Sequence, residues 1–261
     1  MTSRSVVQAN SHASVSIDLD QGCRLASLVV DGNELLVTEG SGPIDWGCYP
    51  MAPYAGRVRD GRFSFEGSDF ELPRTVGRHA IHGTVYLQPW EQEGPSSFVA
   101  ELNDPWPFTG FVRQDVRLEE DAIRLRLEVH ALERPMPASC GWHPWFRRTV
   151  AGAPLRLEFE PGFALERDAD GITTRAQAPV PSEPWDECFG GVGRPPVVEW
   201  PGVVRLEIAS DCPWWVAYTE PPHAVCIEPQ THPPDALNHV PFVVEPGSPL
   251  VAATTISWRR G

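Results

Sequence analysis

Apolar and polar residues alternate along several short segments of the chain. In residues 123–130, apolar side chains at the odd positions alternate with charged or polar side chains at the even positions. This period of two is typical of a β-strand that is buried on one face. Similar apolar or alternating segments occur at residues 15–19, 63–65, 155–159, 203–208, 214–218 and 252–258. No segment has the period and caps of a long helix, so the pattern predicts an antiparallel, all-β protein.

Glycine and proline separate these segments. The 22 glycines and 28 prolines are spread along the chain rather than gathered in one linker, which favours many tight connections in a large antiparallel β-sandwich. The segment 179–201 is richest in both and is interpreted as a long functional loop, in which Trp185, Phe189 and Trp200 are expected to be anchored. We predict a single domain over residues 1–261, because all-β domains of this length are common.

Charge composition excludes several classes of function. The chain has 35 acidic and 21 basic residues, and its formal net charge of −14 opposes binding to nucleic acid or to anionic membranes. Every basic residue is arginine. Schiff-base and pyridoxal chemistry, which need a lysine amine, are therefore excluded, as is a phosphate loop of the Walker type. The expected partner is a small molecule.

The cysteines and the N-terminal residues bear on the compartment. Six cysteines lie far apart and form no C-x-x-C pair, so we expect buried free thiols rather than a zinc or redox site. The N-terminal residues do not follow the signal-peptide pattern, and no apolar run is long enough for a transmembrane helix. These features predict a cytoplasmic protein, monomeric or homodimeric, that binds no membrane.

Three titratable residues stand where the chain bends or stiffens. Glu228 follows a short apolar run and precedes a segment with three prolines, His82 precedes Gly83, and His143 precedes Pro144. Side chains at strand ends and in the loops that follow them are well placed to meet substrates. One carboxylate and two histidines indicate proton-transfer chemistry. Taken singly, each would more often be a structural or surface residue.

Four motifs, in order, resemble the aldose 1-epimerase (mutarotase) family. They are the run 53–63 (PYAGRVRDGRF), His82-Gly83, the run 143–146 (HPWF), and the run 228–230 (EPQ) with PDA at 234–236. The run 104–108 (DPWPF) is similar to a segment of that family as well, and the resemblance extends over nearly the whole chain. It implies a galactose mutarotase-like supersandwich with a sugar cleft across one sheet.

The resemblance also implies roles for individual residues. Glu228 matches the general base, His143 the general acid, and His82 a second histidine beside the sugar ring. Arg57 is implied to bind sugar hydroxyls, and Asp186 is implied to grip the substrate. For an uncharged polyol, Arg57, Asp186 and Gln230 would together supply the donors and acceptors that orient hydroxyls. Two alternatives stay open, Arg59 in place of Arg57 and Glu187 in place of Asp186; in a strand, positions 57 and 59 would share one face.

These residue types suit the interconversion of two anomers. Ring opening of a hemiacetal removes a proton from the C1 hydroxyl and delivers one to the ring oxygen, and reclosure after rotation about C1–C2 gives the other anomer. A carboxylate can accept the first proton, and an imidazolium can donate the second near neutral pH. No cofactor or metal is expected, because the chemistry needs none and the histidines lack metal-binding spacing. A neighbouring carboxylate would favour protonated His143, whereas enclosure by aromatic residues would oppose it.

Three other functions are considered. A hexose-6-phosphate 1-epimerase would need extra arginines at the cleft, for which Arg74 and Arg78 are candidates. A non-catalytic carbohydrate-binding or sensor protein would have no need of Glu228 and the two histidines. A glycosidase would use two carboxylates, such as Asp186 and Glu228. His79 and His232 are candidates for the rim of the cleft. The hypothesis favoured here is a mutarotase for aldohexoses such as glucose or galactose.

Overall fold

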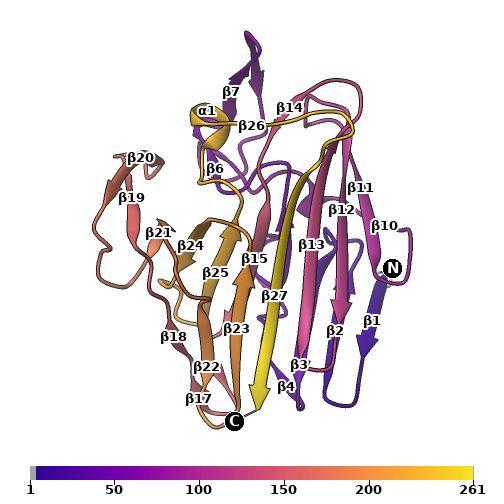
Figure 1. Ribbon diagram of the computed structural model, residues 1–261, viewed down its shortest axis with the longest axis vertical. Coiled ribbons are helices and arrows are strands. Elements are labelled where there is room, and N and C mark those ends of the chain that lie inside the picture. Colours follow the sequence, from indigo (N-terminus) through magenta and orange to yellow (C-terminus); the bar gives the residue numbers. More distant parts are fainter. Residues whose placement is uncertain (1–3, 261) are drawn as a thin grey trace.

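Two large antiparallel sheets form the body of the molecule in the computed structural model, which describes residues 4–260 (Figure 1). One sheet has eleven strands and the other has eight. The long strands of the eight-stranded sheet run steeply through the lower and middle parts of the view. Every pairing between the described strands is antiparallel, as the alternating sequence pattern predicts, and the architecture is a β-sandwich.

The eleven-stranded sheet carries the candidate site near its middle. Its order is β1-β2-β3-β5-β15-β25-β24-β21-β19-β20, and β4 pairs with β3 beside this path. The strands are β1 (Ser5–Ala9), β2 (Ala13–Asp18), β3 (Arg24–Val30), β4 (Asn33–Glu34), β5 (Cys48–Met51), β15 (Gly141–Arg147), β19 (Phe163–Arg167), β20 (Thr173–Ala178), β21 (Asp186–Gly190), β24 (Trp214–Tyr218) and β25 (Ala224–Gln230).

The eight-stranded sheet covers one face of the first. Its order is β10-β11-β12-β13-β27-β23-β22-β18. The strands are β10 (Glu91–Gln92), β11 (Ser97–Leu102), β12 (Gly110–Leu118), β13 (Ala122–Ala131), β18 (Arg156–Glu158), β22 (Val197–Trp200), β23 (Val204–Ser210) and β27 (Leu250–Arg260).

Short elements complete the fold. Four two-stranded sheets pair β6 (Arg57–Val58) with β9 (Ala80–Ile81), β7 (Arg62–Phe65) with β8 (Ser68–Glu71), β14 (Met136–Ala138) with β26 (Phe242–Val244), and β16 (Thr149–Val150) with β17 (Ala153–Pro154). The described residues also contain two 3₁₀ turns, η1 (Arg59–Gly61) and η2 (Val85–Leu87), and one short α-helix, α1 (Ala236–His239). None of the helices in this part of the chain is long and apolar enough to cross a membrane.

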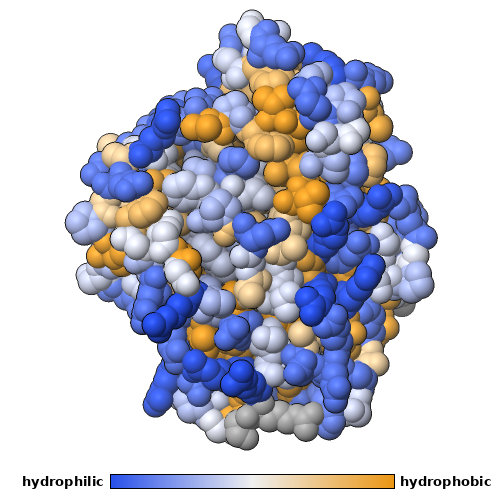
Figure 2. All heavy atoms as spheres, in the orientation of Figure 1, coloured by the Kyte–Doolittle hydropathy of each residue, from blue (hydrophilic) through white to orange (hydrophobic). Residues whose placement is uncertain are grey.

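The main core lies between the two large sheets. Ile123, Leu125, Leu127 and Val129 of β13 are buried there, while Arg124 and its even-numbered neighbours face outward, which confirms the predicted alternation. Such alternation places one face of a strand in the core. Outside the core, polar side chains cover much of the face seen in Figure 2, and apolar ones concentrate toward the top, where Figure 1 places β7, β14 and β26.

A buried hydrogen-bonded glutamine joins the two sheets. The Gln114 side chain of β12 accepts a hydrogen bond from Trp142 Nε1 of β15 at 2.9 Å and donates one to the Cys23 carbonyl oxygen at 2.7 Å. A buried amide is tolerated because both of its polar ends are satisfied. Trp142 therefore belongs to the core face of β15, and its neighbour His143 projects from the opposite face.

The segment 179–201 is not the long loop that the sequence analysis expected. It contains β21 of the eleven-stranded sheet and β22 of the eight-stranded sheet. Trp185, Phe189 and Trp200 are buried, as predicted. Phe189 lies in β21 and Trp200 lies in β22. The high glycine and proline content concealed two strands of only five and four residues.

Candidate active site

A row of side chains crosses the middle of the eleven-stranded sheet on its outer face. The register pairs Trp145 of β15 with Cys226 of β25. Two residues along each strand, His143 therefore lies opposite Glu228, and on its other side His143 pairs with Tyr49 of β5. Directly opposed residues of antiparallel strands project from the same face. Sheet register thus brings together two residues that are 85 positions apart in the sequence.

A second row lies beside the first. Trp145 is two residues from His143 and shares its face of β15. Tyr218 of β24 pairs with Cys226 on one side and with Asp186 of β21 on the other. The two rows and the loops above them enclose a cavity of about 230 Å³. The predicted residues Glu228, His143, His82, Arg57, Asp186 and Gln230 all line it.

His143 and Glu228 form a direct pair at the floor of this cavity. His143 Nε2 is 3.2 Å from Glu228 Oε1, and the two side chains are 6% and 2% exposed. The His143 ring stacks against Tyr49 at 4.9 Å and against Trp145 at 5.3 Å between ring centroids. Gln230 Nε2 donates a hydrogen bond to Glu228 Oε2 at 3.2 Å. Aromatic contacts and strand backbone together fix the orientation of the pair.

His82 reaches the same floor from a strained turn after β9. Its φ is +61°, a left-handed conformation that is uncommon for residues other than glycine. Gly83 follows with φ +83°, and a Cβ there would lie 1.9 Å from the Ala52 carbonyl oxygen. The His82 ring lies edge-on to His143, with 5.0 Å between centroids. The motif His82-Gly83 therefore reflects a turn that only glycine can complete at position 83.

Arg57 projects into the cavity, and Arg59 does not. Arg57 lies in β6, which pairs with β9 through Ile81, and its Nη2 is 3.6 Å from Asp186 Oδ2. The expectation that positions 57 and 59 share one face of a strand is wrong, because β6 ends at Val58 and Arg59 begins η1. Arg59 instead contacts Asp168 and Asp170 on the hairpin β19–β20.

Asp186 rather than Glu187 faces the cavity. They are successive residues of β21, so their side chains point to opposite faces of the strand. Asp186 Oδ2 is 3.1 Å from Arg167 Nη1, in addition to its contact with Arg57. Asp186 thus stands between two arginines. Glu187 is not part of the cavity lining, and its carboxylate comes only within 3.9 Å of Arg167.

Burial controls the charge of the floor. Loss of solvent raises the pKa of Glu228 well above its ordinary value, and the charge of Asp186 raises it further. Burial lowers the pKa of His143 to about 3, and the nearby Arg24 adds to the effect. Burial also lowers the pKa of His82. Of the two opposing influences that the sequence analysis named for His143, enclosure is therefore the stronger, and burial favours the uncharged form of both His143 and Glu228.

Several lining residues had no signal in the sequence. Tyr49 lies in an unbroken buried run of β5, and Asp45 lies in a polar loop. Their contribution depends on strand register and on loop packing, neither of which the residue pattern encodes. Conversely, His79 and His232 are absent from the cavity lining, although both were candidates for its rim. His79 Nδ1 accepts a hydrogen bond from the Asp60 amide at 3.1 Å, a structural role.

Comparison with known proteins agrees with this arrangement. The family model described as aldose 1-epimerase matches residues 4–257. The chain belongs to the aldose 1-epimerase family. The uncharacterized protein YphB of Escherichia coli K12 is 24% identical over 254 residues, which cover 86% of this chain and 88% of that protein. The sequence resemblance is thereby confirmed at the level of the family.

Solved structures of low sequence identity share the fold of this epimerase-family chain. A galactose mutarotase-like protein from Clostridium acetobutylicum superposes with a TM-score of 0.85 at 16% identity, covering 98% of this chain and 95% of the other. The GalM/aldose epimerase homologue from C. elegans gives a TM-score of 0.82 at 18% identity, covering 99% of each chain. These likenesses confirm the predicted mutarotase-like sandwich.

The described residues contain no cluster of side chains suited to a metal ion. Within residues 4–260, no group of three or more His, Cys, Asp or Glu side chains is arranged to hold a metal ion. The six cysteines are free and buried, as predicted.

Proposed function

We propose that this member of the aldose 1-epimerase family is a mutarotase that interconverts the α and β anomers of free aldohexoses such as glucose or galactose. The observation that carries the proposal is the buried contact between His143 Nε2 and Glu228 Oε1 at 3.2 Å, facing a cavity of about 230 Å³. An acid and a base at hydrogen-bond distance can exchange the two protons that anomerisation requires.

The pair begins the reaction with one mobile proton. Of the two residues, Glu228 holds that proton more tightly, because burial disfavours both the carboxylate and the imidazolium. A sugar C1 hydroxyl that donates to Glu228 stabilises the carboxylate, and the charge of Arg57 acts in the same direction. The proton then passes to His143 across their contact. This transfer produces the carboxylate base and imidazolium acid of the proposed mechanism.

Ring opening and reclosure then use the same two residues. Glu228 accepts the proton of the C1 hydroxyl while His143 donates one to the ring oxygen, which gives the open aldehyde. After rotation about C1–C2, His143 takes the proton back from the C5 hydroxyl as its oxygen attacks the aldehyde, and Glu228 returns a proton to O1. Reclosure leaves the carboxylate and the imidazolium, and the proton passes back from His143 to Glu228 when the sugar leaves. No cofactor takes part in this scheme.

The remaining lining residues are suited to a polyol. Arg57 and the backbone-anchored Asp186 supply donors and acceptors on one side, and Gln230 Oε1 is a buried acceptor with no hydrogen-bond partner among the described residues. Trp145 and Tyr218 present apolar ring surface to sugar C–H bonds. We propose His82 as a further ring-side contact. Such paired polar groups with an aromatic wall are typical of pockets for neutral ligands.

The distribution of arginine favours a free sugar over a hexose 6-phosphate. Arg74 and Arg78, the candidate phosphate ligands, do not line the cavity. Arg74 donates to the Asp60 backbone carbonyl, and Arg78 pairs with the Asp60 carboxylate. The cation that does face the cavity, Arg57, is already beside Asp186. That carboxylate already neutralises part of the Arg57 charge, which leaves less attraction for a phosphate.

Polarimetry tests the proposal directly. Freshly dissolved α-D-glucose and α-D-galactose are followed under conditions of slow spontaneous mutarotation, with wild type, Glu228→Gln and His143→Asn. The expected result is acceleration by wild type that is lost in both variants. Glucose 6-phosphate and an aryl glycoside are run in parallel. A wild-type protein that is no faster than buffer on either free sugar would refute the proposed activity, and release of the aryl group would indicate a glycosidase.

We also propose a cytoplasmic location. Its support is the set of six free, buried cysteines, since a reducing compartment keeps thiols unpaired.

A further inference from the structure

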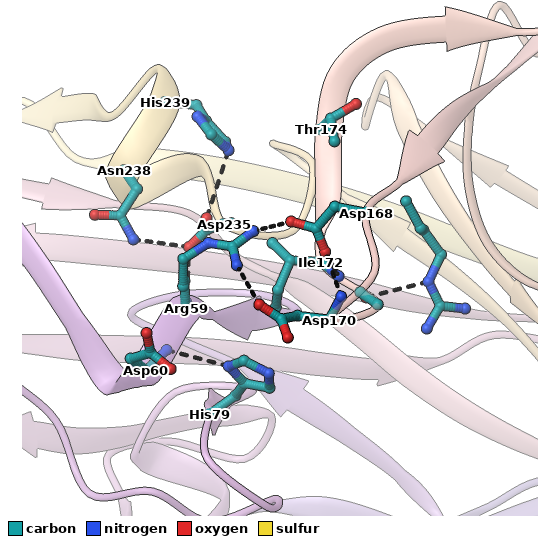
Figure 3. Close-up of polar contacts among 12 residues, drawn as sticks. Arg59, Asp60, His79, Asp168, Asp170, Ile172, Thr174, Asp235, Asn238 and His239 are labelled. Carbon is teal, nitrogen blue, oxygen red and sulfur yellow. Dashed lines mark hydrogen bonds and ion pairs between the residues drawn. The ribbon is translucent and has the colours of Figure 1, made fainter.

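A group of ion pairs outside the cavity lining joins η1 to the hairpin β19–β20 (Figure 3). Arg59 of η1 contacts two carboxylates in the turn of the hairpin β19–β20. Its Nη2 pairs with Asp168, and its Nη1 is 3.1 Å from Asp170 Oδ2. In Figure 3 the guanidinium of Arg59 lies between the two aspartates, so the contacts join η1 to a hairpin more than a hundred residues away.

Arg59 is tied through the backbone to the substrate-side residue Arg57. The Arg59 amide donates to Asp235 Oδ1 at 2.9 Å, and the Asp235 amide donates to the Arg57 carbonyl oxygen at 2.7 Å. The Asp235 side chain is 1% exposed, and Asn238 Nδ2 also donates to its Oδ1. This buried junction fixes Arg59 and Arg57 relative to each other. A shift at one is therefore transmitted to the other.

The hairpin is tied in the same way to Asp186. Strand β19 pairs with β21 through Phe163 opposite Gly190 and Ala164 opposite Phe189, and the side chain of Arg167 farther along β19 reaches Asp186 of β21. Arg167 Nη1 donates to the Asp186 carbonyl oxygen at 2.6 Å and contacts its carboxylate. The next residue, Asp168, is the partner of Arg59. Neighbouring residues on each segment thus make an inner contact, Arg57–Asp186, and an outer contact, Arg59–Asp168.

We propose that Arg59 is a positioning residue for sugar binding: its ion pairs with Asp168 and Asp170 hold the hairpin β19–β20 against η1 and thereby fix Asp186 at the distance from Arg57 that the substrate requires. The inference rests on the proposed function for its substrate. The three side chains have no place in the cavity lining, so Arg59 acts through Arg167 and Asp186 rather than on the sugar.

The outer contact between Arg59 and Asp168 keeps its charges near neutral pH. Backbone hydrogen bonds from Ile172 and the contact with Arg59 lower the pKa of Asp168, so the carboxylate stays ionised below the usual range. The Arg59, Asp168 and Asp170 side chains are 34%, 32% and 44% exposed. Ion pairs at such exposure are screened by salt. The connection should therefore weaken with ionic strength while the buried floor does not.

The test compares Arg59→Met with the matched control Arg62→Met. Arg62 lies three residues on and pairs with Glu71 in the exposed hairpin β7–β8, away from the cavity. For Arg59→Met we expect KM for galactose to rise by about fivefold, in keeping with the modest strength of half-exposed ion pairs, with kcat within about twofold of wild type. The control should keep wild-type KM. Raising the salt concentration should increase KM of wild type but not of Arg59→Met.

Two further variants separate positioning from stability. Arg59→Lys keeps the positive charge, so its KM should lie between those of wild type and Arg59→Met. Asp168→Asn retains the oxygen that accepts the backbone amides, and its effect on KM should not add to that of Arg59→Met, because both remove the same contact. Additive effects on KM, or a wild-type KM in Arg59→Met, would overturn the proposal.

Hydrogen exchange gives a readout that needs no sugar turnover. In Arg59→Met, amides of the hairpin 163–178 and of β21 should exchange faster than in wild type, and in Arg62→Met they should not. If wild type fails to accelerate mutarotation, the proposed function falls and faster exchange still supports the mechanical link. Unchanged exchange in Arg59→Met refutes the link itself.

Discussion

The floor and the rim of the cavity are built on opposite physical principles. The floor pair, His143 and Glu228, lies on two central strands of the eleven-stranded sheet and is almost completely buried. The rim, formed by Arg57, Asp186 and the Arg59 contacts, lies on short strands and turns and is a fifth to two-fifths exposed. Burial therefore favours the uncharged forms of the floor residues, whereas the rim residues keep their charges and form ion pairs.

This difference gives the floor and the rim separate roles in the proposed reaction. Burial moves the pKa values of the floor pair so that one proton is shared, which suits proton transfer but gives little long-range attraction. Ion-paired groups at the rim hold full charges that can orient hydroxyls, but salt screens them. Changes at the floor should therefore alter kcat, and changes at the rim should alter KM.

The largest effect is expected from the floor. Glu228→Gln and His143→Asn should each lower kcat by about 10²–10⁴-fold, the usual contribution of a positioned acid or base. Because the two residues act as one proton-exchanging pair, the double variant should be little slower than either single variant. Polarimetry at saturating galactose measures this. Multiplying effects in the double variant would mean that the residues act independently.

At the rim, Arg57→Met should raise KM by about 10–100-fold, because the variant loses a charged hydrogen-bond donor to the sugar. The value of kcat should change much less, since the floor pair is intact. Initial rates over a range of galactose concentrations separate the two constants, with Arg62→Met as the control. A fall in kcat at unchanged KM would show that Arg57 stabilises the transition state. The rim and the floor would then not differ in their roles.

The pH profile distinguishes the two regions further. Activity needs one proton on the floor pair, so it should be lost only when a second proton is added or the first is removed. The pKa of His143 is about 3, and that of Glu228 lies well above its ordinary value. We expect kcat/KM, which reports the groups of the free protein, to stay level from weakly acidic to neutral pH and to fall when alkali removes the proton from Glu228. A fall centred near pH 6.5 would instead indicate a solvent-exposed histidine.

Much of the fold could be predicted from residue pattern. The segment 214–218 coincides with β24, and the alternation at residues 123–130 lies within β13. Local pattern suffices where one face of a strand is buried. It fails in β21 and β22, where prolines and glycines surround strands of five and four residues, and in β5, where both faces are buried and alternation disappears.

The candidate site was predictable only in part. Motif order identified some of the residues that line the cavity, including His143 and Glu228, but not that strand register places these two directly opposite each other. Arg167 had no signal, because its importance comes from contacts of its side chain with Asp186 on another strand. Arg59 was misplaced because a single turn after Val58 redirects it. Tertiary contacts of this kind depend on register and turns, which local pattern leaves undetermined.

The smallest expected effect concerns stability. A carboxyl group whose folded pKa exceeds its unfolded value binds its proton more tightly in the folded state, so its contribution to stability is lost as pH rises from about 4.3 through the folded pKa. Glu228 has such a raised pKa. Glu228→Gln should therefore raise Tm relative to wild type by a few degrees at pH 8, and by less at pH 5. Thermal unfolding at both pH values measures the difference, with the exposed Glu71→Gln as control. An equal shift at the two pH values would show that Glu228 is not a charge-suppressed group, and the contrast between floor and rim would then need another physical basis.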